Sequence, residues 1–266
     1  MSRLELKKLR KAYGDTVVLE GIDLDLASGE FCAVVGASGC GKSTLLKMLL
    51  GQESPTSGSL LLDGAPLPTE PSPERGIVYQ RYSVFRHMTV AENVRFGLEL
   101  RDGDPVFGLC FGARRRAIRA RGAELIDSVG LGHVADRYPS QLSGGMQQRL
   151  ALAQAIALEP PLLLLDEPFG ALDPGNRSAM HDLLRKLWRA AGMTVVMVTH
   201  DLAEAFYLGT RVLVLDRPDA GSGIRTPGVG ARITYDLPLR RGAVAPTDVA
   251  DEAPQEPPLM TSTHHD

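Results

Sequence analysis

The sequence predicts an α/β fold built on a mostly parallel sheet with helices on both faces. Runs of apolar and β-branched residues, bounded by turn residues, recur at 31–35, 60–62, 162–165, 194–198 and 212–215. The runs 162–165 and 195–198 do not alternate with polar residues, which indicates strands buried on both faces, as in a parallel sheet. Helical patterns flank several of these runs, and that order of elements is typical of α/β proteins.

Composition limits the class of protein. The chain has 266 residues, 44% of them hydrophobic, which is enough for a substantial core. A net charge of −3 argues against a general binder of nucleic acid or anionic membranes. Cys32, Cys40 and Cys110 form no C-x-x-C pair, so we expect a reducing cytosol and neither a disulfide framework nor a zinc site. The charged N-terminus and the lack of a run near the roughly 18 apolar residues of a membrane span predict a chain that is neither secreted nor membrane-spanning by itself.

A glycine-rich segment follows the first of these runs. Residues 36–43 read GASGCGKS, which matches G-x-x-x-x-G-K-[ST] with a strand before it and a helix-forming segment after it. Glycines let successive backbone N–H groups point inward at a helix N-terminus, where they cradle phosphate oxygens. Lys42 would reach the β- and γ-phosphates, and Ser43 would place its hydroxyl on Mg²⁺. The alternative is a glycine-rich turn that merely connects a strand to a helix, and the register of strand, loop and helix argues against it.

Two acids end the buried run at 162–165. Asp166 can hold the Mg²⁺ that bridges the β- and γ-phosphates, and Glu167 can orient and deprotonate the attacking water. Taken alone, the pair could equally be an acidic helix cap before Pro168. Together with the glycine loop, it indicates the second half of a nucleotide site.

The middle of the chain is helical in pattern. Between about 85 and 158 strand patterns disappear, and helical patterns cover 90–100, 114–129 and 146–158, which predicts a helical subdomain inserted into the α/β core. Ser143, Gly144 and Gly145 precede the last of these helices. Their N–H groups and hydroxyl would suit a second anion site, and an ordinary helix cap explains the same residues.

The end of the chain has a different composition. From about residue 242 it is rich in Ala, Pro, Asp and Glu, and such a segment buries too little apolar surface to fold. We therefore expect 241–266 to be a disordered tail.

Six motifs in order carry a resemblance to a known family. They are the glycine loop at 36–43, Gln80 after an apolar run, LSGGMQQR at 142–149, Asp166-Glu167-Pro168, ALD at 171–173 and THD at 199–201. This set, covering about residues 3 to 217, resembles the ATPase subunits of ABC transporters. The resemblance implies a P-loop NTPase (RecA-like) core with a small antiparallel β subdomain and an inserted α-helical subdomain, so that 3–240 is a nucleotide-binding domain.

The resemblance also implies roles for individual residues. Tyr13 would stack on adenine, which suits a flat aromatic face. Glu167 would be the general base, Gln80 would contact Mg²⁺ and the attacking water, and His200 would hydrogen-bond the γ-phosphate. Mg²⁺ would be held by Ser43, Gln80 and Asp166. The residues implied to contact ATP are Tyr13, Gly36, Ala37, Ser38, Gly39, Cys40, Gly41, Lys42, Ser43, Thr44, Ser143, Gly144 and Gly145.

The resemblance further implies an assembly. Two copies would form a head-to-tail dimer in which Ser143, Gly144 and Gly145 of one copy close over ATP held by the other, with Asp173 at the seam. The dimer would work on transmembrane permease subunits, and indirectly with a solute-binding protein, at the cytoplasmic face of the bacterial inner membrane as a peripheral subunit. Residues 81–85 resemble the region that contacts the permease, although apolar side chains there could equally belong to a subdomain core.

Two segments leave their role open. Residues 101–112 hold apolar side chains in a glycine-rich stretch that could pack on the helical subdomain or contact the membrane partner. A basic run nearby is most simply a solvated helix face, with lipid headgroups or a permease loop as the alternative partners. Its members are Arg114, Arg115, Arg116, Arg119 and Arg121.

The resemblance also bears on the transported solute. Residues 82–94 and 166–173 resemble importers of the nitrate, sulfonate and taurine group, which favours a small polar or ionic solute. Other small nitrogen compounds, such as urea- or guanidine-like solutes, and a non-transport ABC ATPase remain alternatives. An ABC-type ATPase working on DNA is disfavoured because such proteins carry long heptad coiled coils and this sequence has none.

Overall fold

The structure is a computed structural model that describes residues 2–80, 83–102, 112–218 and 228–239. The expected tail at 241–266, Cys110 and most of the 101–112 stretch lie outside the described residues, as do Arg81 and Tyr82. Among the helices of the described ranges, none is both long and apolar enough to cross a lipid bilayer.

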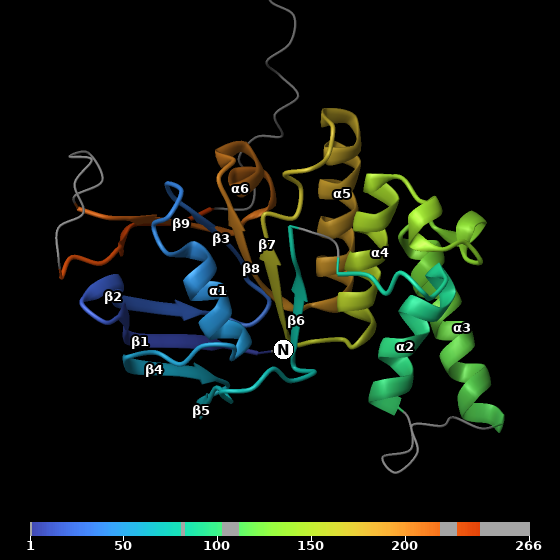
Figure 1. Cartoon of the computed structure of the whole chain (residues 1–266), viewed down its shortest axis with the longest axis horizontal. Helices are drawn as coiled ribbons and strands as arrows, with labels where there is room; N and C mark the ends of the chain where they lie inside the picture. Colours follow the sequence, from blue (N-terminus) through green and yellow to red (C-terminus); the bar gives the residue numbers. More distant parts are fainter. Residues whose placement is uncertain (1, 81–82, 103–111, 219–227, 240–266) are drawn as a thin grey trace, which may run out of the picture.

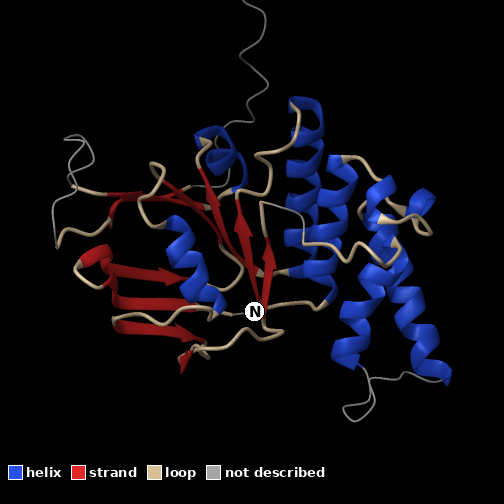
Figure 2. Cartoon of the chain, in the orientation of Figure 1, coloured by secondary structure: helices blue, strands red, loops and turns tan. Residues whose placement is uncertain are grey.

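A six-stranded sheet forms the centre of the molecule (Figure 2). Its strand order is β10-β9-β3-β8-β7-β6, and every neighbouring pair is parallel except β9 with β10. The strands are β3 (Phe31–Val35), β6 (Arg75–Val78), β7 (Leu162–Asp166), β8 (Thr194–Thr199), β9 (Arg211–Asp216) and β10 (Arg232–Pro238).

A second, four-stranded antiparallel sheet lies beside the first (Figure 1). Its order is β2-β1-β4-β5, and the run expected at 60–62 belongs to this sheet. The strands are β1 (Leu4–Tyr13), β2 (Thr16–Leu26), β4 (Ser57–Leu62) and β5 (Ala65–Pro66). In β2 buried residues mostly alternate with exposed or half-buried ones, so one face of the strand is buried and the other faces solvent.

The six-stranded sheet separates two hydrophobic cores. Along β3 the side chains of Phe31, Ala33 and Val35 enter one core, and those of Cys32 and Val34 enter the other. The same division of alternate residues holds in β7 and β8. This explains why the sequences of these strands are apolar throughout: both faces are covered.

Helix α1 (Lys42–Leu50) fills the space between the two sheets (Figure 1). Leu45, Leu46, Met48 and Leu49 are at most 2% exposed and share a core with residues of β1, β2 and β3. The helix that follows the glycine loop is therefore clamped along its length by buried contacts. Its N-terminal end is held in place by the fold rather than by local sequence alone.

The other face of the six-stranded sheet is covered by helices. Helix α5 (Pro174–Ala191) places Trp188 edge-on against Phe31, with ring centroids 5.5 Å apart. Helices α2 (Val90–Asp102) and α3 (Gly112–Ser128) pair on the side of the molecule away from the second sheet (Figure 1). The remaining helices are α4 (Gly144–Ala157), α6 (Leu202–Leu208) and two short 3-10 turns, η1 (Gly132–Val134) and η2 (Pro139–Gln141).

Candidate active site

The glycine loop connects the end of β3 to the start of α1. A side chain at Gly36 would place its Cβ 2.1 Å from the carbonyl oxygen of Leu215, so only glycine fits there. Gly41 caps α1 with φ of 103°, and a Cβ on it would lie 2.8 Å from a methyl group of Leu19. The loop therefore depends on these two glycines for both its conformation and its packing.

Lys42 is the buried cation of the loop. The residue is only 6% exposed. Its Nζ donates hydrogen bonds to the carbonyl oxygens of Gly36 (2.7 Å) and Ala37 (3.0 Å). These partners are neutral, so the positive charge of the ammonium stays available to an anion. Burial raises the pKa of the neighbouring Cys40 thiol, with the Lys42 charge acting in the opposite direction, so Cys40 serves as a buried packing residue.

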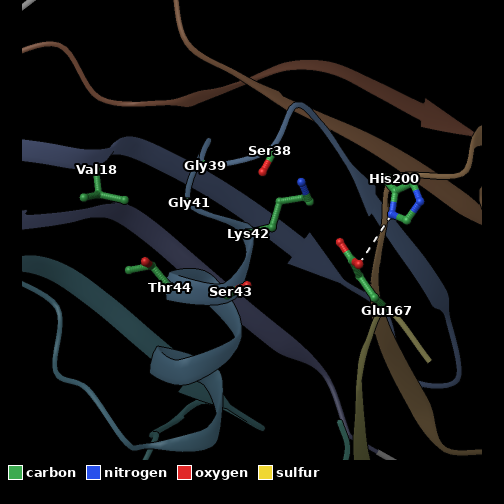
Figure 3. A pocket seen from close by; sticks show the side chains of 9 residues that line it. All are labelled: Val18, Ser38, Gly39, Gly41, Lys42, Ser43, Thr44, Glu167 and His200. Atoms are coloured by element: carbon green, nitrogen blue, oxygen red, sulfur yellow. Dashed lines mark ion pairs between the residues drawn. The ribbon is translucent and has the colours of Figure 1, made fainter. Parts of the chain in front are cut away.

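A cavity of about 500 Å³ lies over the loop (Figure 3). That volume is in the range of small-molecule sites. Two groups of residues face each other across it. Residues of the glycine loop and the start of α1 lie on one side, and Glu167 and His200, which follow β7 and β8, lie on the other. The lining residues are Val18, Ser38, Gly39, Gly41, Lys42, Ser43, Thr44, Glu167 and His200.

Asp166 and Glu167 stand at the carboxyl end of β7, as expected from the sequence. Asp166 is half-buried, and its pKa is raised above the ordinary aspartate value, first by burial and then by the charge of Glu167, while Lys42 lowers it. Glu167 has φ of 44°, in the left-handed region that non-glycine residues rarely adopt. The turn after β7 is thus strained at the residue whose carboxylate points toward the cavity (Figure 3).

Two polar side chains converge on one oxygen of Glu167. Gln80, which follows β6, donates a hydrogen bond from Nε2 to Glu167 Oε2 over 3.2 Å. His200, which follows β8, places Nδ1 3.4 Å from the same oxygen. The carboxyl ends of three neighbouring parallel strands therefore bring together Gln80, Glu167 and His200, the three residues expected to perform catalysis.

The donor set suits Mg²⁺ bound together with phosphate. Within the described residues no three His, Cys, Asp or Glu side chains gather as a metal cage. Magnesium is usually held by one or two carboxylates together with substrate phosphates and water. The raised pKa of Asp166 indicates that its charge beside Glu167 is poorly compensated, which a cation at this position would relieve. Ser43 lines the same cavity, whereas the Gln80 amide contacts Glu167.

Tyr13 does not line the cavity. Its hydroxyl donates a hydrogen bond to Glu53, Lys11 Nζ lies 4.8 Å from the centre of its ring, and the residue is 46% exposed. Val18 of β2 lines the cavity instead, and sequence reasoning missed it. A signal existed: Val17, Val18 and Leu19 are three consecutive apolar residues in an alternating strand, so the middle one must face the opposite side.

Ser143, Gly144 and Gly145 lie apart from the cavity of their own chain. Ser143 caps α4 by accepting a hydrogen bond from the backbone N–H of Met146 over 3.3 Å. Both Ser143 and Gly144 are exposed, and none of the three residues lines the cavity. Helix α4 stands on the opposite face of the six-stranded sheet from α1 (Figure 1). The predicted second anion site is therefore separate from the first within one chain.

A glycine loop and a buried lysine at the end of a parallel strand define a P-loop NTPase fold. A family model described as ABC transporter matches residues 19–170, more than half of the chain, and the chain belongs to the ABC transporter family. The solved dimeric post-hydrolysis structure of an ATP-binding cassette bound to ADP and Pi is similar, with a TM-score of 0.70 and 30% identity. The alignment of the two structures covers 89% of this chain and 99% of the cassette's chain.

Curated relatives are import subunits by name. The Sulfate/thiosulfate import ATP-binding protein CysA of Thermosynechococcus vestitus is 44% identical over 88% of this chain and 66% of its own length. The Nitrate import ATP-binding protein NrtD of Synechocystis sp. is 41% identical over 80% of this chain and 77% of its own length. The chain thus spans slightly less than two thirds of the sulfate/thiosulfate relative.

Proposed function

We propose that this chain is the ATP-binding and ATP-hydrolysing subunit of a bacterial ABC importer, with residues 3–240 as its nucleotide-binding domain. The observation that carries the proposal is the arrangement around one cavity. Lys42 lies on one side of it, and Glu167, contacted by both Gln80 and His200, lies on the other. This is a phosphate cradle facing a general base.

The chemistry follows from these positions. The backbone N–H groups of 36–44 and the ammonium of Lys42 bind and orient the β- and γ-phosphates. Gln80 and His200 hold the Glu167 carboxylate in place, and Glu167 accepts the proton of the attacking water. His200 then donates a hydrogen bond toward the γ-phosphate. Asp166 and Ser43, with Gln80 beside them, would hold a Mg²⁺ ion, which would neutralise part of the phosphate charge.

The dimer is part of the proposal. Because Ser143, Gly144 and Gly145 are exposed or half-buried and lie away from the cavity of their own chain, they are free to meet ATP bound by a second copy. Their N–H groups would complete the shell of donors around the γ-phosphate. ATP would then hold the two copies together, and its hydrolysis would release them.

Permease subunits are the proposed membrane partners. A second cavity of about 260 Å³ opens between β6 and α2, and it is lined by residues that include Tyr79, Phe85 and Phe96. Phe85 is 39% exposed, so an apolar helix of a permease has a place to dock there. This placement supports a peripheral position at the cytoplasmic face of the inner membrane, with a solute-binding protein acting on the permease from the other side.

A small oxyanion is the proposed solute. Relatives named for sulfate/thiosulfate and nitrate import support this class, in line with the nitrate, sulfonate and taurine resemblance. A urea- or guanidine-like solute and a non-transport role are the competing candidates. Uptake of labelled sulfate, nitrate and urea by cells with and without the gene distinguishes the three, since a non-transport ATPase changes none of them.

Two variants test the proposed catalytic roles. Glu167→Gln should bind ATP and lower turnover by about a hundredfold or more, because the amide cannot accept the proton of water. Lys42→Ala should bind ATP weakly, because the charge in the cradle is lost. Phosphate release and binding of a fluorescent ATP analogue measure the two effects. Normal turnover by Glu167→Gln, or unchanged ATP affinity in Lys42→Ala, contradicts the proposal.

A further inference from the structure

Arg177 connects three segments that meet behind the candidate active site. It lies in the first turn of α5, and its side chain is one-third exposed. Nη2 donates a hydrogen bond to the carbonyl oxygen of Leu172 over 3.1 Å. Nη1 lies 3.6 Å from Asp201 Oδ2, and Nε lies 3.7 Å from Glu204 Oε1. One guanidinium therefore contacts the loop after β7, the loop after β8 and helix α6.

These contacts surround the two residues that flank His200. Thr199 Oγ1 donates a hydrogen bond to Glu204 Oε2 over 2.8 Å, and the backbone N–H of Asp201 donates to Thr199 Oγ1 over 3.0 Å. Asp201 also caps α6 through hydrogen bonds from the N–H groups of its first turn. The backbone on either side of His200 is thus held by groups that Arg177 contacts directly.

The charges explain why an arginine is needed there. Glu204 is 5% exposed, and a buried carboxylate is costly unless a cation and hydrogen bonds compensate it. Its other basic neighbour, His181, places Nε2 3.6 Å from Oε1 and is charged only when protonated. Arginine stays charged at every relevant pH, and its planar fork can contact several acceptors at once.

We propose that Arg177 is a positioning residue that sets the distance between Glu167 and His200. It ties the loop after β7, which begins at Glu167, to the loop after β8, which carries His200. The inference rests on the proposed function, in which these two side chains act on the same water and phosphate. Arg177 itself does not line the cavity, so it acts through the loops and touches no reacting atom.

The expected consequence is a loss of rate without a loss of binding. The hydrogen bond and ion pairs of Arg177 go to Leu172, Asp201 and Glu204, and not to the glycine loop between β3 and α1. The affinity for ATP should therefore stay within about twofold. Displacement of a catalytic group by about 1 Å costs up to a hundredfold in rate. Arg177→Ala should therefore lower kcat per bound ATP by between about tenfold and a hundredfold.

The experiment compares four single variants and one double variant of the full chain, purified with any membrane proteins that accompany it. Arg177→Ala removes the three contacts, and Arg177→Lys keeps the charge but cannot span all three acceptors. Glu204→Gln removes the buried charge and keeps the shape. Arg185→Ala is the matched control, because Arg185 lies on the same helix and packs on the ring of Tyr207. Phosphate release is normalised to ATP sites counted by titration.

The result expected is a low kcat with an unchanged KM for ATP in Arg177→Ala and Arg177→Lys, and near-normal values in Arg185→Ala. The kcat of the double variant Arg177→Ala with Glu204→Gln should be only slightly lower than that of Arg177→Ala, because both changes break one network. A merely structural role would lower the count of ATP sites and leave kcat per site unchanged, and that result overturns the inference. Arg177→Lys decides the question if the alanine variant does not fold.

His200→Ala separates this inference from the proposed function. If His200→Ala loses turnover and Arg177→Ala matches Arg185→Ala, the positioning role is wrong and the proposed function stands. If His200→Ala turns over ATP normally, the role of His200 in the proposed function fails, and the positioning role fails with it.

Discussion

Asp166 and Glu167 are covalent neighbours in different electrostatic surroundings. Glu167 has two polar partners, Gln80 and His200, on one of its oxygens. Asp166 is half-buried, and its pKa is raised first by that burial and then by the charge of Glu167. The ionised form of Asp166 is therefore less favourable in the folded protein than in water, and a cation beside it would offset that cost.

Asp166→Asn should stabilise the protein in metal-free buffer at pH 7. The folded-state pKa of Asp166 is raised, so the folded state binds the proton more tightly and stability is lost as the pH rises from the ordinary aspartate value through the raised one. Asparagine removes that loss. We expect a gain of roughly 1 to 3 °C in Tm at pH 7 that disappears toward pH 4, measured by thermal unfolding with a chelator.

Asp236→Asn is a control for which we expect the opposite change in Tm at pH 7. Its carboxylate accepts hydrogen bonds from Arg211 over 2.6 and 2.7 Å, and Arg211 lowers the pKa of Asp236. The stability from this pair is present above the ordinary aspartate value and lost as the pH falls through the lowered one. Asp236→Asn should therefore lower Tm at pH 7. A lower Tm for Asp166→Asn as well would contradict the reasoning for Asp166.

At the level of elements, helix α5 connects the candidate site to the sheet. Asp173 caps its N-terminus by accepting a hydrogen bond from the N–H of Asn176 over 3.1 Å, and Pro174 occupies the first helical position. Gly192 ends it with φ of 64°. Trp188 packs against Phe31 in the centre of the sheet. Because α5 is held at both ends and along one face, the backbone position of Arg177 is well defined.

Asp173→Ala should cost about 1 kcal/mol of the free energy of unfolding, the usual effect of losing an N-cap side chain. Asp173→Asn should restore most of it, because asparagine caps helices about as well as aspartate. Urea unfolding of the two variants beside the parent protein measures the difference. Equal destabilisation by both changes would show that the negative charge of Asp173, rather than the cap, is what stabilises the helix.

Much of this element order could be predicted from sequence, because buried strands leave a clear pattern. Strand β3 was predicted at its exact bounds, and β7 and β8 within one residue, since both faces of each are covered. Strand β1 escaped the pattern because solvent-facing Lys7 and Lys8 interrupt it. Only the family resemblance implied the antiparallel sheet that holds β1 and β2. The run of Val17, Val18 and Leu19 shows only that Val18 faces the opposite side from its neighbours, not that it lines a cavity. Arg177 could not be found from local motifs, since its proposed role depends on neighbours far away in the chain.

At the level of the whole molecule, the residues of the proposed site lie on two faces of the six-stranded sheet. The cavity lies over α1, while Ser143 and Gly145 stand at the start of α4 on the other side of the six-stranded sheet. A second copy is the simplest way to bring the two together, as proposed above.

Gly145→Asp should abolish the ATP-dependent dimer and leave the monomer folded. A Cβ at Gly145 would meet Asn176 at an ordinary 3.5 Å, and an acid in the first turn of a helix is favourable. Across an interface, the new carboxylate would instead repel the γ-phosphate. Analytical ultracentrifugation with Mg·ATP, in a Glu167→Gln background, should give a dimer without the change and a monomer with it.

Ala113→Asp is the matched control for this prediction. Ala113 is exposed and is the second residue of α3, just as Gly145 is the second residue of α4. The control should remain dimeric with ATP. A Gly145→Asp variant that still dimerises would place the start of α4 outside the interface.

The pairing of β3 has a consequence for biosynthesis. Phe31 pairs with Val195 of β8, about 160 residues later in the chain, and Cys32 pairs with Arg211 of β9. At a translation rate of about 5–20 residues per second, this apolar strand leaves the ribosome roughly 10 to 30 seconds before its partners exist. Nascent chains of this protein thus carry an unpaired, aggregation-prone strand for most of their synthesis, and chaperones that shield such segments should matter to its yield.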